Sequence, residues 1–161
     1  MTHDDHNLAP GNRRELISHL RDAIDDMGWR NLRVAERMLA PYSLTFPQVI
    51  VLALLDQHGP ELEMSTIAQQ TGLPASTITS IMDRLVARGF AVRHHSETDR
   101  RRITGSASND GARVLQELDA ARVASLERLV AEFAEAEIEL LTRLIDRWTA
   151  ISEEYSGTNQ R

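Results

Sequence analysis

The residues best able to do chemistry fall into two short groups near the middle of the chain. One group shares the outward side of a helical pattern and consists of small hydroxyl residues and one arginine: Ser76, Thr77, Thr79, Ser80 and Arg84. The other is a run of arginines that directly follows Asp99: Arg100, Arg101 and Arg102. Hydroxyl groups donate and accept hydrogen bonds, and guanidinium groups pair with phosphates. Together the groups indicate binding of a polyanion.

Residues of these types are also common on ordinary solvent-exposed surfaces. The choice between such a surface and a binding site therefore depends on the secondary structure that holds these residues. Ser65 is the expected N-cap of a first short helix, Gly72 ends it, and Pro74 begins a second helix. Apolar residues recur in the second helix at spacings that predict one buried face: Ile78, Ile81, Met82, Leu85 and Val86. Two helices joined by a short glycine-containing turn, with small polar groups facing outward, fit a DNA major groove about 12 Å wide.

A strand hairpin is predicted after the second helix, which Gly89 ends. Residues 90–95 alternate with the period of two that is typical of a half-buried strand, and residues 96–99 have turn composition. Residues 61–64 predict a further short strand that completes a three-stranded sheet. Arginines at the hairpin tip suit the narrow minor groove of A·T-rich DNA.

The chain contains three blocks of sequence in this order: LTFPQ at residues 44–48, STIAQQTGLPASTITSIMDRLVARGF at 65–90 and DRR at 99–101. Together they resemble the MarR family of winged helix-turn-helix transcription regulators. The resemblance implies a mainly α fold with a small antiparallel β wing, in which a winged helix-turn-helix is joined to a helical dimerisation domain. It also implies that Asp99 braces Arg101, which enters the minor groove, while Arg100 and Arg102 contact phosphates.

The chain departs from the family pattern at two places. Relatives often carry Arg or Lys near positions 75 and 80, where this chain has Ala75 and Ser80. Base readout by bidentate arginine is therefore expected to be absent from this helix, and more of the affinity falls on the wing. Relatives also usually end the last strand in Leu-Thr, whereas residues 105–108 are Gly-Ser-Ala-Ser, for which we expect a bulge at Gly105.

Helical patterns flank this central region on both sides. Residues 13–39 form one, with an irregularity expected at Gly28, and a run from Asp110 forms either one long helix or two, with a weak break near Glu135. Between them, Thr45 and Gln48 form a capping box that begins a strongly apolar, central helix. The small central helix-turn-helix region cannot cover the apolar faces of the flanking helices. We therefore expect a homodimer; a monomeric helical bundle is the alternative.

These patterns divide the chain into four parts. We expect disordered tails at residues 1–12 and 156–161, a helical dimerisation region at 13–42 and 108–155, and a winged helix-turn-helix DNA-binding domain at 43–107. The tail residues His3, Asp4, Asp5 and His6 are interpreted as solvated, and His94 and His95 point to opposite faces of one strand. No metal or other cofactor is expected.

Composition limits the function classes. The net charge of −6 argues at first against a nucleic-acid partner, but residues 76–102 hold six arginines against three acidic residues. Because salt screens charges over about 8 Å, this local patch is compatible with DNA binding without being evidence for it. The absence of cysteine excludes disulfides and cysteine-based peroxide sensing. With no stretch of 18 apolar residues and no signal-like N-terminus, the chain is expected to be cytoplasmic.

The resemblance also implies a small effector, since members of the family commonly respond to aromatic or phenolic anions. The candidate lining, which is otherwise ordinary core or surface, is His19, Met27, Trp29, Arg30 and Met38. The predicted function is a homodimeric, ligand-responsive DNA-binding regulator, most often a repressor, of a pseudo-palindromic operator. The alternative is a winged-helix protein-interaction module. An enzyme is not expected, because the sequence lacks a glycine-rich phosphate loop, HExxH and a nucleophile elbow.

Overall fold

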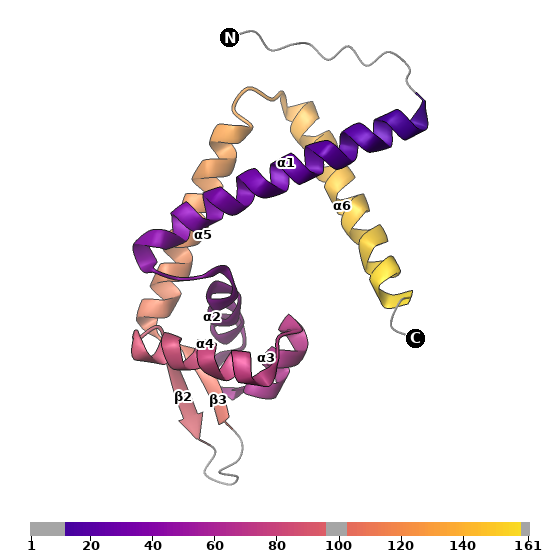
Figure 1. The fold of residues 1–161 in the computed structure, drawn as a ribbon. Coiled ribbons are helices and arrows are strands. Elements are labelled where there is room, and N and C mark those ends of the chain that lie inside the picture. Colours follow the sequence, from indigo (N-terminus) through magenta and orange to yellow (C-terminus); the bar gives the residue numbers. More distant parts are fainter. Residues whose placement is uncertain (1–11, 96–102, 159–161) are drawn as a thin grey trace. The chain divides into compact units, whose positions relative to one another are not determined.

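The computed structural model describes residues 12–95 and 103–158 (Figure 1). In order, the helices, 3-10 turns and strands are α1 (Arg13–Leu39), η1 (Ala40–Tyr42), α2 (Phe46–His58), η2 (Gly59–Glu61), β1 (Leu62–Glu63), α3 (Met64–Thr71), α4 (Ala75–Ala87), β2 (Ala91–His95), β3 (Ile103–Ala107), α5 (Asn109–Leu129) and α6 (Glu135–Thr158). The three strands form one antiparallel sheet in the order β1–β3–β2. The predicted mainly α fold with a small antiparallel sheet is confirmed.

The chain divides into two compact units, Met1–Leu118 and Asp119–Arg161. In the first unit the core lies where α2, α3 and α4 meet the sheet and the start of α5 (Figure 1). Its fully buried side chains come from all three helices: Val51, Leu52, Leu55, Ile67, Ile78, Met82 and Leu85. Burying one such side chain contributes about 1.5–3 kcal/mol, so this packing fixes the helix-turn-helix in place.

The first turn of α2 is built as its sequence predicts. The side-chain oxygen of Gln48 accepts a hydrogen bond from the backbone N–H of Thr45 at 2.9 Å, which is one half of a capping box. Gln48 is buried, at 5% exposure, so this bond also satisfies a polar group inside the protein. The helix begins at Phe46, and its apolar residues then enter the core.

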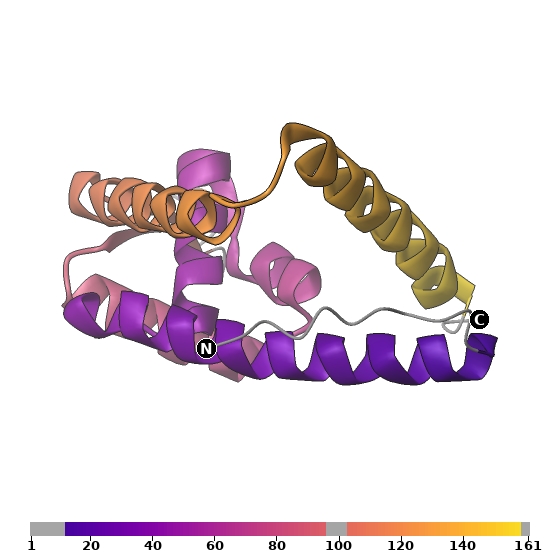
Figure 2. The same cartoon turned by 90° about the horizontal axis from the view of Figure 1, so that it is seen from above.

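Helix α1 is unbroken over its 27 residues, and Figure 2 shows it as a straight rod. The irregularity expected at Gly28 is therefore wrong. A single glycine costs a helix only about 1 kcal/mol relative to alanine, too little to interrupt a helix of this length. At the N-terminus, the side chain of Asn12 accepts a hydrogen bond from the backbone N–H of Arg14 at 3.3 Å.

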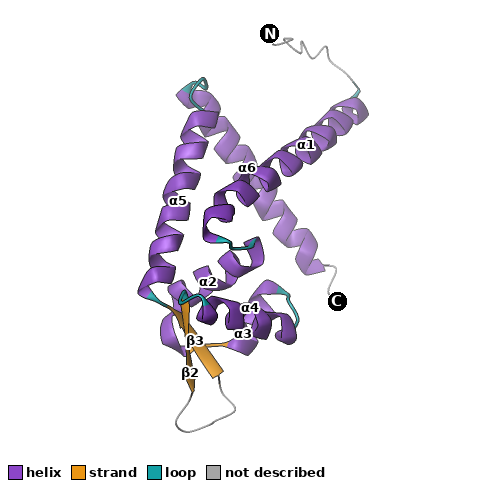
Figure 3. Ribbon diagram, turned by 60° about the vertical axis from the view of Figure 1, so that its left-hand side comes forward, coloured by secondary structure: helices purple, strands orange, loops and turns teal. Residues whose placement is uncertain are grey.

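The sheet corrects a second expectation, the bulge at Gly105. Strands β2 and β3 lie side by side (Figure 3) and pair without an extra residue from Ala91 opposite Ala107 to His95 opposite Ile103. Strand β1 pairs with the other edge of β3. A Cβ atom at Gly105 would lie 2.6 Å from Cε of Met82 and 3.0 Å from Cδ2 of Leu55. The glycine thus allows the strand to approach the helices closely and adds no bulge.

Two local details also differ from the sequence expectation. Helix α3 begins at Met64, with Glu63 at the N-cap, and the hydroxyl of Ser65 donates to the Glu63 carboxylate at 3.3 Å. Val86 is 38% exposed and does not belong to the buried face of α4. Each residue turns a helix by about 100°, so Val86 lies about 40° beyond Met82, which forms that edge of the buried stripe.

The C-terminal helical run is two helices, α5 and α6, separated by residues 130–134. Ser108 precedes α5 and caps its first turn, since its hydroxyl accepts a hydrogen bond from the N–H of Gly111 at 3.0 Å. The first turns of α5 then add Val114 and Leu118 to the core of the first unit. Helix α6 forms most of the second unit and carries large exposed apolar side chains.

Within the described residues, no single helix is long and apolar enough to cross a membrane. Helices α1 and α2 meet the length and composition requirement only as a pair bent by 69°, and α2 is the central helix of the core.

Candidate nucleic-acid interface

The turn between α3 and α4 is fixed by the residues that the sequence singles out. Gly72 has φ 68°, the left-handed conformation that ends α3, and Pro74 occupies the N-cap of α4. The hydroxyl of Thr71 donates to the carbonyl of Ile67 at 2.7 Å and accepts from the N–H of Leu73 at 3.3 Å. Gly89, at φ 74°, follows α4. The turn and the ends of both helices therefore lie where they are predicted, whereas α3 begins two residues earlier than its predicted N-cap at Ser65 implies.

All five predicted contact residues of the second helix lie on α4. Ser76, Thr79, Ser80 and Arg84 are exposed, whereas Thr77 is half-buried. The hydroxyl of Thr79 donates to the carbonyl of Ala75 at 3.0 Å, which leaves its oxygen as an acceptor for a partner. Arg84 lies near the C-terminus of α4, and it makes no ion pair with another described residue. The exposed side of α4 is thus small, hydroxyl-rich and positively charged at one end.

Strand β2 is attached to α4 by Arg93, whose role the sequence reading missed. Nη1 of Arg93 lies 2.6 Å from Oδ1 of Asp83, and Nη2 donates to the carbonyl of Thr79 at 3.2 Å. The ion pair is partly exposed, so its contribution to stability is modest. Its geometric effect is to hold the hairpin beside the exposed side of α4.

A signal for this contact was present in the strand pattern. Arg93 follows the buried Ala91 by two positions and therefore shares its inward side. An inward arginine needs a partner, and Asp83 on the neighbouring helix supplies it.

The positive patch is smaller than the arginine count suggests. Arg93 is paired with Asp83, and the guanidinium of Arg88 donates to the backbone carbonyls of Tyr42 and Ser43. Among the described residues of 76–95, Arg84 is left as the exposed positive charge beside the hydroxyl groups. The wing residues Asp99, Arg100, Arg101 and Arg102 lie outside the described residues, so their roles remain predictions.

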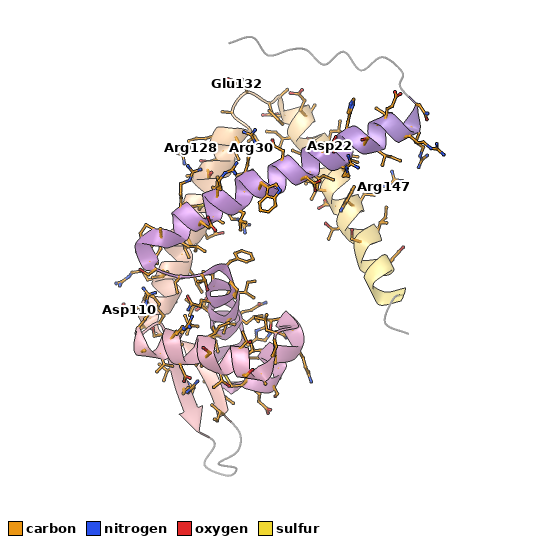
Figure 4. All side chains as sticks on the ribbon, in the orientation of Figure 1. Asp22, Arg30, Asp110, Arg128, Glu132 and Arg147 are labelled. Carbon is orange, nitrogen blue, oxygen red and sulfur yellow. The ribbon has the colours of Figure 1, made fainter. Side chains whose placement is uncertain are left out.

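The predicted effector residues are not brought together within one chain. His19, Met27, Trp29 and Arg30 are exposed along α1, and Met38 is half-buried near its end. A straight helix separates His19 from Met38 by about 28 Å. Arg30, labelled midway along α1 in Figure 4, pairs with Asp26, its Nε lying 2.6 Å from Oδ2.

A cavity of about 230 Å³ lies instead where α1 ends and α2 begins. It is lined by Leu32, Ala35, Glu36, Leu39, Ala40, Leu44, Thr45 and Phe46. None of the five predicted residues lines it, although the LTFPQ block contributes Leu44, Thr45 and Phe46. Within the part of the chain that the structure describes, no group of three or more His, Asp or Glu side chains is arranged to hold a metal ion.

A helix-turn-helix whose second helix continues into an attached antiparallel hairpin defines a winged helix-turn-helix protein. Comparison with known proteins agrees, because residues 42–102 match the model of the MarR family. Over these residues the chain is similar to the MarR family. This is a family of transcription regulators and not of enzymes.

Two curated relatives come from Bacillus subtilis (strain 168). The uncharacterised HTH-type transcriptional regulator YfiV is 37% identical over 75 residues, which are 47% of this chain and 46% of the relative. The HTH-type transcriptional repressor MdtR is 34% identical over 95 residues, 59% of this chain and 61% of the relative. The chain thus spans about half to three fifths of the length of these two relatives.

The fold agrees with a solved structure, that of Streptococcus pneumoniae FabT in complex with DNA. The TM-score is 0.75 at 15% sequence identity, and the alignment covers 86% of this chain and 99% of FabT. At this identity the similarity concerns the fold.

Proposed function

We propose that this chain is a homodimeric DNA-binding transcription regulator that represses from a pseudo-palindromic operator and is released by a small aromatic or phenolic ligand. The observation that carries the proposal is the exposed side of α4. Most of its hydroxyl groups and Arg84 are exposed to solvent, and the Arg93–Asp83 ion pair holds strand β2 beside them. In this class of protein such a helix enters the major groove while the wing contacts the adjacent DNA.

The dimer is supported by apolar surface on both flanking helices. On α1, Leu16, Ile17, Leu20, Met27, Trp29 and Leu32 are between 43% and 65% exposed; on α6, the exposed residues include Leu140, Leu144, Ile145, Trp148 and Ile151. Large exposed apolar areas usually mark an interaction surface, and each of the two helices carries such residues. A two-fold dimer would place two copies of α4 in successive major grooves about 34 Å apart.

The cavity beside η1 supports the ligand part of the proposal. Its lining is mainly apolar, and it includes the aromatic ring of Phe46. The carboxylate of Glu36 also lines it, so a neutral phenol is favoured there over a carboxylate anion. Arg30 and His19 remain the candidate partners for an anionic effector.

The rival function is a winged-helix module that binds a protein. The net charge of −6 favours it, as do the two arginines, Arg88 and Arg93, that are engaged within the chain. A DNA-binding regulator would be located in the cytoplasm, where its operator lies. A protein-binding module is not restricted to that compartment.

Salt dependence separates the two functions. Fluorescence anisotropy would follow binding to a labelled duplex taken from the DNA upstream of the gene itself, at increasing salt. A regulator with six or more phosphate contacts loses about 10³-fold or more in affinity between 50 and 200 mM salt. Absence of binding at 50 mM, or an affinity that does not change with salt, would favour the protein-binding module.

A further inference from the structure

Arg88 joins the C-terminal end of α4 to the turn between α1 and α2. Its Nη1 donates to the carbonyl of Ser43 at 2.5 Å, and its Nη2 donates to the carbonyl of Tyr42. The guanidinium also lies over the ring of Phe90, 5.0 Å from its centroid. These contacts connect residues that are 45 and 46 positions apart in the sequence. A planar group with several fixed donors is suited to holding two adjacent carbonyls at once.

The turn that receives Arg88 has a defined conformation of its own. Ser43 adopts φ 47°, in the left-handed region, where a residue other than glycine is uncommon. The hydroxyl of Tyr42 donates to a carboxylate oxygen of Glu117 on α5 at 2.6 Å, and this hydrogen bond raises the pKa of Tyr42. The turn is therefore tied to α4 through Arg88 and to α5 through Tyr42.

The residues on either side of the turn line the cavity. Ala40 precedes it and Leu44 follows it, and both residues line the cavity, as does Leu39 at the end of α1. A molecule in the cavity would thus contact the residues that flank Tyr42 and Ser43, whose carbonyls accept hydrogen bonds from Arg88.

We propose that Arg88 is a positioning residue that sets the orientation of α4 on DNA by fixing its C-terminal end to the turn at Tyr42 and Ser43. The turn then transmits changes at the end of α1, or in the neighbouring cavity, to the recognition helix. This inference rests on the proposed DNA-binding function. It assigns Arg88 an internal role and not contact with DNA.

The competing role is direct contact with a phosphate, because Arg88 is exposed as well as bonded. The two roles differ in salt dependence. A phosphate contact releases counterions, so its loss reduces the slope of log affinity against log salt by about 1 and weakens binding to every sequence alike. A positioning residue affects the fit to the correct sequence and leaves the slope unchanged.

The test compares Arg88→Ala with Arg84→Ala, which removes an arginine from the last turns of α4 that has no internal carbonyl partner among the described residues. Two duplexes are used: one selected by the wild-type protein from a randomised pool, and a scrambled duplex of the same composition. For Arg88→Ala we expect affinity for the selected duplex to fall about tenfold, as for the loss of one charge-assisted hydrogen bond, with an unchanged salt slope and unchanged binding to the scrambled duplex. For Arg84→Ala we expect a smaller slope and weaker binding to both.

Arg88→Lys separates geometry from charge. Lysine keeps the positive charge, but as a single ammonium it cannot hold two carbonyls in a planar fork. We expect Arg88→Lys to remain weaker than wild type on the selected duplex. Full recovery by lysine would overturn the proposal, as would a reduced salt slope in Arg88→Ala or an unchanged affinity for the selected duplex.

Amide hydrogen exchange measured without DNA separately tests the contact of Arg88 with the carbonyls of Tyr42 and Ser43. In Arg88→Ala, but not in Arg84→Ala, we expect faster amide exchange in residues 40–44 and at the end of α4. Equal exchange in wild type and Arg88→Ala would overturn the positioning role. If the wild-type protein itself fails to bind DNA, the proposed function fails, and the exchange result still decides whether Arg88 joins α4 to the turn.

Discussion

At the scale of single residues, the wing and the exposed side of α4 are expected to contribute differently to DNA binding. Arg101→Ala should lower affinity for all sequences, and by more than Ser80→Ala does, because it removes a charged group from the minor groove; hydrogen bonds to charged groups contribute about 1.5–3 kcal/mol. Ser80→Ala removes one neutral hydrogen bond, which contributes about 0.5–1.5 kcal/mol. Fluorescence anisotropy on one operator duplex measures both variants. A wing variant that binds like wild type would contradict the assignment.

The residues that were predictable are those whose partners lie close in the sequence. The Thr45–Gln48 capping box and the exposed hydroxyl residues of α4 follow from local spacing, and the structure has both. The contacts of Arg88 were not predictable in this way, because its carbonyl partners are 45 and 46 positions away. Counting arginines therefore overstated the charge available to a partner.

At the scale of elements, glycine positions make a sharp test of the packing. A Cβ atom at Gly111 of α5 would lie 2.1 Å from the backbone oxygen of Phe90, a contact that the flexible end of a side chain cannot relieve. We expect Gly111→Ala to lower the free energy of unfolding by about 1–3 kcal/mol, in the range for overpacked cores. Urea unfolding at a fixed protein concentration measures the change.

Gly28→Ala is the matched control, because a Cβ atom at Gly28 meets nothing within 4 Å and the residue lies in the middle of α1. Alanine there should raise stability by up to about 1 kcal/mol, as for a helix interior. If both substitutions had the same effect, the close packing of α5 against Phe90 would be wrong.

The order of the elements was largely predictable, and their exact fit was not. Gly72, Pro74 and Gly89 mark the ends of α3 and α4 through backbone conformation, which is a local property. The role of Gly105 depends on Met82 and Leu55, which approach it only in the folded protein. A sequence pattern shows that a glycine is unusual in a strand, but it does not distinguish a bulge from close packing.

At the scale of the whole molecule, the exposed apolar side chains of α6 predict self-association. Leu144 is 54% exposed, and a charge placed at an apolar subunit interface is strongly unfavourable. We expect the wild-type chain to sediment as a dimer at micromolar concentration and Leu144→Glu to shift it toward the monomer. Analytical ultracentrifugation measures both.

Val92→Glu is the matched control for that experiment. Val92 is also apolar and is 43% exposed, but it lies on strand β2 of the wing sheet. This variant should remain a dimer. A wild-type monomer, or equal dissociation of the two variants, would contradict dimerisation through the flanking helices.

The negative net charge of the chain is unevenly distributed along the sequence. The charge is concentrated in residues 107–161, which hold eleven acidic residues against six arginines. Asp110, labelled at the start of α5 in Figure 4, pairs with Arg113 at 2.9 Å, as is typical of a solvated helix surface. The acidic balance thus belongs to helices proposed for dimerisation, and it does not argue against DNA binding by α4.

The central claim is that the chain reads DNA sequence as a two-fold dimer. The most direct test is selection by the wild-type protein from a pool of randomised duplexes, followed by sequencing of the bound fraction. The account predicts enrichment of an inverted repeat whose half-sites are about 10 base pairs apart, centre to centre, or a multiple of that spacing. Recovery of no common sequence, or of a single half-site without its inverted copy, would contradict it.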